Sequence, residues 1–304
     1  MKIYLNAPKE SWIVDRFVKE WKNHNKSIST RFITNSDIIW IISPWTWRNL
    51  SIKQLKDKKV ICTIHHLDPA KFDQNDFEEL DQFVNIYHII TKKTEKFLRS
   101  LTEKEIFYSP FWVDSNKFYE IKDKSDIRSK HQLPKEDFII GSFQRDTEGA
   151  DNRSPKLEKG PDNFIEIVTF LYKKQKNLNI LLTGNHRNYI INNLKKLDIP
   201  YVYLPMVDTK KINELYNCLN LYIVASRVEG GPQAILECAL SKTPIISTDV
   251  GIANEILSSK SIFNMPNFEN ATPETDYAYE KVQNYTIPNG FQTFINKFKE
   301  IYEN

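Results

Sequence analysis

Two glutamates flank a glycine-containing turn in the segment Ser226-Arg-Val-Glu-Gly-Gly-Pro-Gln-Ala-Ile-Leu-Glu237. Carboxylates accept hydrogen bonds from hydroxyl groups, so the pair suits a ligand that carries sugar rings. Glu229 precedes the glycines, and Glu237 lies about two helical turns beyond them. The two carboxylates would therefore contact different parts of one ligand, Glu237 the hydroxyls of a ribose and Glu229 those of a second sugar.

The turn between the glutamates could bind an anion. Gly230 and Gly231 allow the backbone to approach a ligand closely. Pro232 suits the first turn of a helix, where its missing N–H costs nothing. The amides of Gln233 and Ala234 would then point toward a negative group, and the helix dipole would add a favourable potential. A pyrophosphate between two sugars would satisfy both the turn and the glutamates.

Parallel sheets with crossover helices are the predicted framework, because short β-branched or aromatic runs alternate with longer amphipathic segments. The predicted strands are Lys2–Leu5, Ile38–Ile42, Val60–Ile64, Ile86–Ile90, Phe138–Ser142, Ile180–Thr183, Tyr201–Tyr203, Leu221–Val224 and Pro244–Ser247. The predicted helices are Glu10–Asn23 and others that begin near Asp162, Lys210, Pro232 and Asn254. The fold class is therefore α/β with two Rossmann-like halves.

The two halves differ in composition. None of the eight glycines falls before Gly141, and all six tryptophans lie at or before Trp112. The second half is thus the better candidate for holding a phosphorylated ligand. Tryptophan faces pack against sugar rings, which makes the first half the candidate acceptor side. Burial of Trp12, Trp21 and Trp40 in a core explains those residues equally well.

The boundary between the halves is predicted in the charged, turn-rich segment 115–130. We expect an N-terminal acceptor-side domain over residues 1–120 and a donor-binding domain over 121–288. The last helix, 289–304, has one apolar stripe and must pack on something, so it could cross back to the first domain. The stripe consists of Phe291, Phe294, Ile295, Phe298, Ile301 and Tyr302.

Composition excludes several classes of protein. The net charge is only +3, with lysines dispersed among nearly as many carboxylates, so a nucleic-acid partner is not expected. The longest apolar run, Ile38–Ile42, is too short to span a membrane, and the N-terminus reads as a strand. We expect a cytoplasmic protein, with peripheral contact at the inner membrane face left open. Cys62, Cys218 and Cys238 lie in apolar stretches that suit buried, reduced thiols.

The segment Glu229-Gly-Gly-Pro-Gln-Ala-Ile-Leu-Glu237 resembles the E-x7-E signature of glycosyltransferase family 4, also called glycosyl transferases group 1. The segment 241–256 resembles the proline, glycine and Glu-Ile pattern that follows it. The resemblance implies a GT-B fold, two Rossmann-like domains facing a central cleft, and a retaining glycosyltransferase. In that family the first glutamate contacts the donor sugar, the second holds the ribose, and the amides between them bind diphosphate. These roles fall on Glu229, on Glu237, and on the backbone of Gln233 and Ala234.

Two cations belong to the same resemblance. Phe138-Ile-Ile-Gly-Ser-Phe-Gln-Arg145 and Lys159-Gly160 resemble the family's strand-Gly-Arg and Lys-Gly elements, whose cations bind the donor diphosphate. Such cations stabilise the negative charge that grows on the leaving phosphate in place of a metal, and the sequence has no D-x-D motif. The segment 146–158 is longer than usual for the family, and its Arg153 or Lys156 could replace Lys159. Without the resemblance, both cations read as ordinary surface groups.

The first half offers candidates for the other side of the reaction. Val60-Ile-Cys-Thr-Ile-His65 resembles the family's strand ending in Thr-x-His, which implies that His65 faces the donor sugar in the catalytic site. A structural histidine is the alternative. Trp45, Trp47 and Arg48 follow another strand end, where α/β sheets bind ligands. Both rings could stack on an acceptor sugar with Arg48 beside an anion, although hinge packing or contact with a lipid surface would look the same.

The expected reaction moves a hexose or N-acetylhexosamine from a nucleoside diphosphate sugar, with UDP favoured over GDP, to a glycan or glycolipid acceptor. It would serve polysaccharide biosynthesis, with the anomeric configuration retained and with no metal or other cofactor. In the front-side mechanism usually proposed for the family, the leaving phosphate helps to deprotonate the acceptor, and Glu229 orients the donor. A sugar-nucleotide epimerase or phosphorylase of the same architecture, or a non-catalytic sugar-nucleotide binding protein, are the alternatives.

Overall fold

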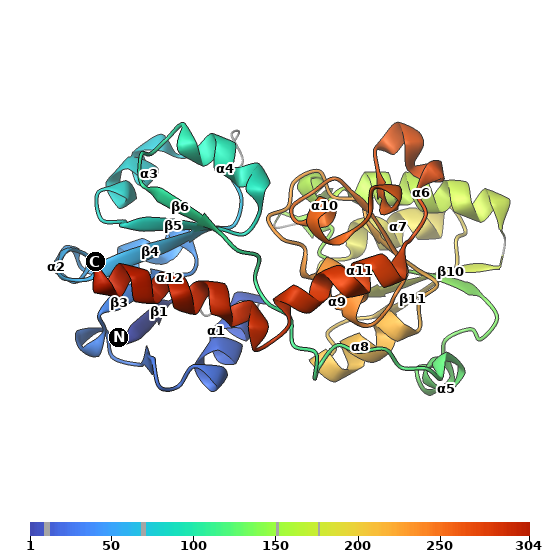
Figure 1. The fold of residues 1–304 in the computed structure, drawn as a ribbon. Helices are drawn as coiled ribbons and strands as arrows, with labels where there is room; N and C mark the ends of the chain where they lie inside the picture. Colours follow the sequence, from blue (N-terminus) through green and yellow to red (C-terminus); the bar gives the residue numbers. More distant parts are fainter. Residues whose placement is uncertain (9–12, 68–70, 150–151, 176) are drawn as a thin grey trace. The chain divides into compact units, whose positions relative to one another are not determined.

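Two compact units make up the chain in the computed structural model, which describes residues 1–304 except 9–12, 68–70, 150–151 and 176. The first unit joins Met1–Trp112 to Tyr285–Asn304, and the second is Val113–Asn284. Each unit contains one six-stranded parallel sheet with helices packed on it (Figure 1). The predicted α/β class is confirmed, and each predicted strand matches an observed strand to within two residues at either end.

In the first unit the strand order is β2-β1-β3-β4-β5-β6. Its strands are β1 Ile3–Asn6, β2 Ser29–Thr30, β3 Ile38–Ile41, β4 Lys59–Ile64, β5 Ile86–Ile89 and β6 Glu105–Tyr108. Its helices are α1 Ile13–His24, α2 Ile52–Asp57, α3 Gln74–Asp81, α4 Lys92–Arg99 and α12 Gln292–Glu303, with short 3-10 turns η1 Ile33–Asn35, η2 Pro44–Asn49 and η7 Asn289–Phe291. The predicted helix Glu10–Asn23 is α1, and its first residues, Trp12 among them, lie outside the described residues.

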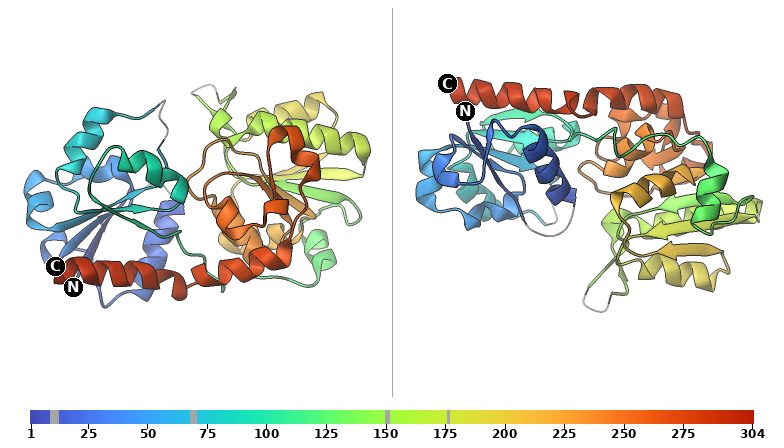
Figure 2. Two further views of the ribbon diagram at one scale, coloured as in Figure 1. Left: turned by 45° about the horizontal axis from the view of Figure 1, so that its top comes forward. Right: turned by 90° about the horizontal axis from the view of Figure 1, so that it is seen from below.

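An aromatic core joins the last helix to the first unit. Phe294 and Phe298 of α12 are fully buried against Trp21 of α1 and Trp40 of β3, with ring centroids 5.1–6.4 Å apart. The apolar stripe of α12 therefore packs on the first unit, on which both chain ends lie (Figure 2). Trp21 and Trp40 are core residues, as the alternative explanation of the tryptophans proposed.

In the second unit the strand order is β11-β10-β7-β12-β13-β14. Its strands are β7 Phe138–Ser142, β10 Leu178–Thr183, β11 Tyr201–Leu204, β12 Leu221–Val224, β13 Ile245–Thr248 and β14 Ile262–Phe263, with a separate antiparallel pair, β8 Thr147–Glu148 and β9 Ser154–Pro155. Its helices are α5 Lys124–Lys130, α6 Pro161–Lys174, α7 Asn188–Lys196, α8 Thr209–Asn217, α9 Gln233–Leu240, α10 Ala253–Ile256 and α11 Thr275–Val282, with 3-10 turns η3 Leu157–Lys159, η4 Ser259–Ser261, η5 Met265–Asn270 and η6 Gln283–Tyr285.

The strand order of the second unit reverses between β7 and β12. From β7 the chain runs outward through β10 and β11, and then returns to β12 and continues to β14 on the other side. Ligands of open α/β sheets bind beyond the carboxyl ends of the strands at such a reversal. The loops after β7 and β12, which carry Arg145 and Glu229, are therefore the expected binding loops of this unit.

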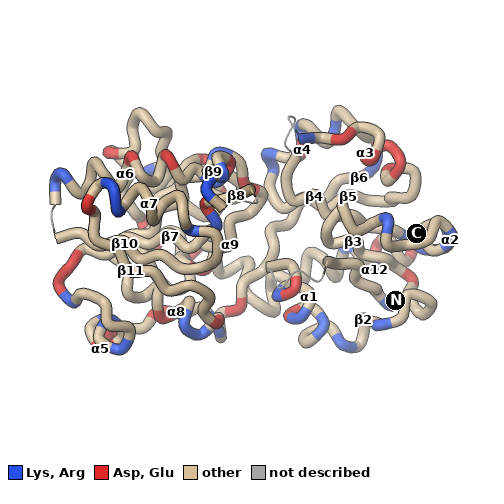
Figure 3. Tube along the Cα trace, turned by 180° about the vertical axis from the view of Figure 1, so that it is seen from behind, with Lys and Arg blue, Asp and Glu red and all other residues tan. Residues whose placement is uncertain are grey.

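The segment that joins the units belongs to the second one. The amides of Tyr119 and Ile121 donate hydrogen bonds of 3.1 and 2.7 Å to the side chains of Asn213 and Asn217 on α8. The boundary that we expected at residue 120 therefore lies inside this unit. Lysine and arginine alternate with aspartate and glutamate along both units (Figure 3), in keeping with the small net charge.

Candidate functional site

The turn after β12 carries the first of the two glutamates. It runs through residues 226–231 before α9 begins. Ser226 is buried, and its hydroxyl donates a hydrogen bond of 3.2 Å to Oε1 of Glu229. The side chain of Glu229 is only 11% exposed, so the carboxylate lies within the turn and does not extend into solvent.

The helix after this turn begins one residue later than predicted. Pro232 occupies the N-cap position with an extended ψ of 109°, so Gln233 and Ala234 are the first two residues of α9. The structure thus shifts the helix start from Pro232 to Gln233. This end of α9 carries the partial positive charge of a helix N-terminus, which favours anions.

Lys159 contacts Glu229 directly. Its Nζ lies 2.6 Å from Oε1 of Glu229, and its side chain is 22% exposed. Lys156, the other candidate, pairs instead with Glu148 at 3.4 Å. The carbonyl of Lys159 also accepts a hydrogen bond of 2.9 Å from the side-chain amide of Gln144, beside Arg145. Of the two candidate lysines, Lys159 is the one that the fold brings to the turn after β12.

A glycine and an arginine fix Lys159 in this place. Gly160 has the left-handed φ of 59°, and a Cβ on it would lie 1.8 Å from the carbonyl oxygen of Ala225. Arg227 binds the carboxylate of Asp162 through two hydrogen bonds of 2.7 Å. The amide of Arg227 donates a further bond of 2.8 Å to the carbonyl of Glu158. These contacts join the start of α6 to the turn after β12, and sequence reasoning missed them.

The loop after β13 supports the same turn from the other side. The hydroxyl of Thr248 donates a hydrogen bond of 2.6 Å to the carbonyl of Ser226. Gly251 has a φ of 50°, and a Cβ on it would lie 2.3 Å from the carbonyl oxygen of Gly230. Only glycine allows this approach, so the glycine that follows the turn in the sequence has a packing role.

Arg145 lies in the exposed loop after β7. Its Nε donates a hydrogen bond of 2.7 Å to the carbonyl of Thr147, and among the described residues no carboxylate pairs with it. A buried arginine, Arg187, holds the backbone of this loop in place. Arg187 donates to the carbonyl of Gln144 and forms an ion pair of 2.8 Å with Asp146. The guanidinium of Arg145 thus extends from a firmly anchored backbone.

Sequence reasoning did not identify Arg187, although it follows the predicted strand that ends at Thr183, at the edge of the sheet where ligands bind. The ion pair between Asp146 and Arg187 attaches the long segment 146–158 to the rest of the second unit at its first residue. Within this segment, β8 and β9 pair with each other.

Glu237 lies on α9, almost completely buried. The hydroxyl of Tyr216, on α8, donates a hydrogen bond of 2.8 Å to Oε2 of Glu237. Burial, together with the nearby carboxylate, raises the pKa of Tyr216 well above its usual value, so the hydroxyl keeps its proton. Glu237 and Glu229 are thus held by different partners on different elements.

His65 follows β4 in the first unit. Its Nε2 lies 2.7 Å from the carbonyl oxygen of Ile42, and because a carbonyl only accepts, Nε2 carries the hydrogen. Burial lowers the pKa of His65 to about 4, so the ring is neutral at pH 7 with Nδ1 as an acceptor. Its ring centroid lies 6.3 Å from that of Trp45 and 5.8 Å from that of Phe111.

The structure corrects the prediction for the Trp45–Arg48 cluster. Trp45 is 54% exposed, but Trp47 is 5% exposed within the core around β4, and its indole N–H donates to Asp76. Arg48 stacks on the Trp47 ring and pairs with Asp76 and Glu79 at 2.8 and 2.9 Å. Trp47 and Arg48 therefore hold η2 in place, and of the two tryptophans only Trp45 has an exposed ring.

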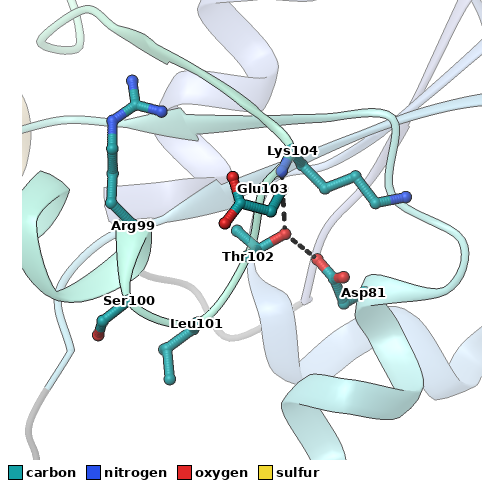
Figure 4. A pocket seen from close by; sticks show the side chains of 7 residues that line it. All are labelled: Asp81, Arg99, Ser100, Leu101, Thr102, Glu103 and Lys104. Carbon is teal, nitrogen blue, oxygen red and sulfur yellow. Dashed lines mark hydrogen bonds between the residues drawn. The ribbon is translucent and has the colours of Figure 1, made fainter.

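A shallow hollow of about 450 Å³ lies elsewhere on the first unit (Figure 4). It is formed where α3 and α4 end and β6 begins, and in it the hydroxyl of Thr102 donates a hydrogen bond to the carboxylate of Asp81. In a parallel sheet the start of β6 is at the edge opposite to His65, which follows the end of β4. The hollow is therefore not part of the candidate site.

Three further observations concern the described residues only. No group of three or more histidine, cysteine, aspartate and glutamate side chains is arranged to hold a metal ion. No helix has the length and apolar character needed to cross a bilayer. Cys62, Cys218 and Cys238 are free and buried, as predicted, and burial raises the pKa of Cys218 to about 12.

Known proteins resemble the chain in both sequence and fold. Residues 123–269 match the family described as Glycosyl transferases group 1. No curated protein matches the chain. The solved structure of Anabaena Alr3699/HepE in complex with UDP and glucose has a TM-score of 0.77 at 11% identity, with 99% of this chain and 100% of that chain covered.

Two other solved structures show the same relationship. Sucrose-phosphate synthase from Thermosynechococcus elongatus has a TM-score of 0.68 at 14% identity, with 98% of this chain and 79% of that chain covered. A glycosyltransferase from Rickettsia africae has a TM-score of 0.69 at 16% identity, with 98% and 84% covered. At these identities the structures establish the fold, which is the GT-B fold. The chain thus combines the GT-B fold with a match to Glycosyl transferases group 1 over residues 123–269, and this match supports transferase activity.

Proposed function

We propose that the chain is a retaining glycosyltransferase that moves a hexose or N-acetylhexosamine from a nucleoside diphosphate sugar to a glycan or glycolipid acceptor. The observation that carries the proposal is the contact between Lys159 and Glu229 beside the N-terminus of α9, inside the Glycosyl transferases group 1 domain. This contact places a cation, which could bind a phosphate, next to a carboxylate, which could bind a sugar, at the edge of the sheet.

The donor we propose is a UDP-sugar in preference to a GDP-sugar. Solved structures with this fold hold UDP or UDP-glucose in Anabaena Alr3699/HepE, and UDP in S. aureus TarM. In this chain Glu237 would accept hydrogen bonds from the ribose, and Glu229 from the transferred sugar. Arg145, Lys159 and the first amides of α9 would bind the diphosphate.

In the proposed reaction the bond between the anomeric carbon and the β-phosphate oxygen breaks. The acceptor oxygen forms a new bond on the same face of the sugar, and its proton passes to the leaving phosphate. Negative charge grows on that phosphate, where Arg145 and Lys159 stabilise it, so the proposal includes no metal ion or other cofactor. Because Glu229 is already paired with Lys159, its proposed role is to orient the donor, without a covalent intermediate.

The first unit would supply the acceptor side. Trp45 offers an exposed ring for stacking on a sugar, beside the neutral His65. We propose that His65 acts as a hydrogen-bonding partner of the reacting sugar, since a neutral imidazole can accept a bond at Nδ1. A cytoplasmic role in polysaccharide biosynthesis, with peripheral contact at the membrane, is part of the proposal on sequence grounds alone.

The test of the donor site is a thermal-shift panel of nucleoside diphosphates and their sugars. A ligand at about 100 times its Kd stabilises the native state by about 2.7 kcal/mol, which corresponds to a Tm increase of roughly 5 °C or more. We expect UDP and UDP-sugars to give the largest shift. Glu237→Ala and Arg145→Ala should abolish most of it, whereas Arg31→Ala, the matched change of an exposed arginine outside the candidate site, should retain it.

Two outcomes would contradict the proposal. Unchanged donor affinity in both Glu237→Ala and Arg145→Ala would remove the site. Donor binding without sugar transfer to any member of a glycan and glycolipid acceptor panel would favour the non-catalytic binding protein. Where transfer occurs, NMR of the product gives the anomeric configuration, and inversion would refute the retaining mechanism.

A further inference from the structure

Tyr216 is a buried side chain that contacts the carboxylate of Glu237. Its hydroxyl donates a hydrogen bond of 2.8 Å to Oε2 of Glu237, and both residues are almost completely buried. The bond joins α8 to α9, two helices that no sequence motif connects. A buried carboxylate gains about twice as much from a hydrogen bond as a neutral acceptor does, so this contact has a large influence on where the carboxylate points.

The position of Tyr216 is itself determined by packing. Its ring lies among aromatic neighbours, with centroids 5.1 Å from Phe143 and 5.5 Å from Tyr222. Its backbone carbonyl accepts a hydrogen bond of 2.9 Å from the hydroxyl of Thr243. The ring is 2% exposed and has little room to rotate, so the hydroxyl is held in place before any ligand binds.

We propose that Tyr216 is a positioning residue for nucleotide recognition: it holds Oε2 of Glu237 so that the carboxylate meets the ribose hydroxyls in the correct orientation. The inference rests on the proposed function, in which Glu237 binds the ribose. A side chain that hydrogen-bonds to a ligand-binding group and orients it influences ligand affinity through that group, because a misplaced acceptor forms weak hydrogen bonds. Tyr216 would thus control discrimination between ribose and deoxyribose without touching the nucleotide.

The experiment compares the Kd of UDP with that of 2′,3′-dideoxy-UDP by isothermal titration calorimetry. The ratio of the two constants isolates the ribose hydroxyls, because the base and the diphosphate are the same. With hydrogen bonds to a charged acceptor at stake, we expect a ratio of about 10 to 100 for the natural protein. Tyr216→Phe keeps the ring and removes only the hydroxyl, and we expect it to lower the ratio about threefold to tenfold.

A matched control lies in the same aromatic cluster. The hydroxyl of Tyr222 accepts a hydrogen bond of 3.0 Å from the amide of Phe143, on the side of the loop that carries Arg145. Tyr222→Phe removes an equally buried hydroxyl, but we expect it to weaken both ligands alike and leave the ratio unchanged. A general loosening of the unit would likewise change both constants together, so the ratio separates positioning from stability.

Glu237→Gln distinguishes failure of this inference from failure of the proposed function. If Glu237→Gln leaves the ratio at its natural value, or if UDP does not bind the natural protein, the proposed ribose contact is wrong and the inference fails with it. If Glu237→Gln removes the discrimination while Tyr216→Phe retains it or increases it, only the positioning role is overturned. A far-UV circular dichroism spectrum confirms that each variant is folded when it is measured.

Discussion

Replacing Arg187 by methionine should destabilise the second unit and release the loop that carries Arg145. The side chains of Arg187 and Asp146 are 0% and 1% exposed, and their ion pair is 2.8 Å long. Arg187 also donates to the carbonyl of Gln144 and to the hydroxyl of Ser142. Methionine fills much of the same volume but leaves the buried carboxylate and these acceptors without their cation.

The magnitude follows from this burial. Breaking a buried ion pair by removing one partner costs about 3–5 kcal/mol, because the remaining charge is shielded from solvent and has lost its counter-ion. Removing the second charge as well, with Asp146→Asn, should recover about half of the loss, since neither partner is then a buried unpaired ion. The double variant Arg187→Met/Asp146→Asn is therefore expected to be more stable than Arg187→Met alone.

The distribution of tryptophan allows unfolding of the first unit to be followed separately from that of the whole protein. All six tryptophans belong to the first unit, so their fluorescence reports its unfolding, while far-UV circular dichroism reports both units. With a urea m-value of roughly 2 kcal/mol/M, the far-UV midpoint of Arg187→Met should fall by about 2 M. Loss of UDP affinity should accompany this change, because Arg145 is no longer anchored.

An unchanged far-UV transition in Arg187→Met would refute the reasoning. So would a double variant that is less stable than Arg187→Met, because the cost would then arise from lost packing and not from an unpaired charge. The comparison needs no assumption about whether the two units unfold together, since the same probe is used for both variants.

Three further predictions concern single positions. Burial lowers the pKa of His88 to about 3, so below pH 6.5 the unfolded chain takes up a proton there that the folded chain refuses, and His65 adds a loss of stability of the same sign. Urea unfolding followed by tryptophan fluorescence should therefore show that His88→Gln loses about 1.4 kcal/mol less per pH unit than the natural protein, and equal losses would contradict the assignment. Lys159→Met should weaken UDP binding by tenfold or more in calorimetry, whereas a twofold or smaller change is expected for Lys156→Met, and the reverse order would identify Lys156 as the phosphate ligand. Gly160→Ala should lower the Tm of the second unit well below that of Gly184→Ala, because both glycines have positive φ but a Cβ at 160 would lie 1.8 Å from a backbone oxygen and one at 184 would lie 3.8 Å from its nearest atom. Equal Tm values would contradict the clash.

The sequence was sufficient for the fold class and for most of the elements. Short runs of β-branched or aromatic residues and the 3.6-residue period of amphipathic helices are local properties of the chain, and the runs predicted Phe138–Ser142 and Leu221–Val224 to the residue. Turn residues are local as well, which is why the segment with Gly230 and Gly231 was recognised as the turn between β12 and α9. The strands β2 and β14 escaped prediction because two residues are too few to form a recognisable run, and the four-residue strand β6 was also missed.

Burial within the first unit could not be predicted in the same way. Trp45 and Trp47 are two residues apart in one short segment, and both are aromatic residues near the end of a strand. The 3-10 turn η2 directs one ring outward and the other into the core, and Asp76, from α3, completes the partners of Trp47 and Arg48. The difference depends on a contact with a distant helix.

The sequence by itself determined that the carboxylates Glu229 and Glu237, a glycine turn and a helix start follow one another after a buried strand, because spacing and residue type are written in the chain. Only the tertiary structure decided that Lys159 meets Glu229, that Tyr216 holds Glu237 and that Arg187 anchors the loop of Arg145. Each of these pairs joins segments far apart in the chain. Their meeting depends on the order of the strands and on the conformation of the loops at their carboxyl ends, which no local pattern of residues encodes.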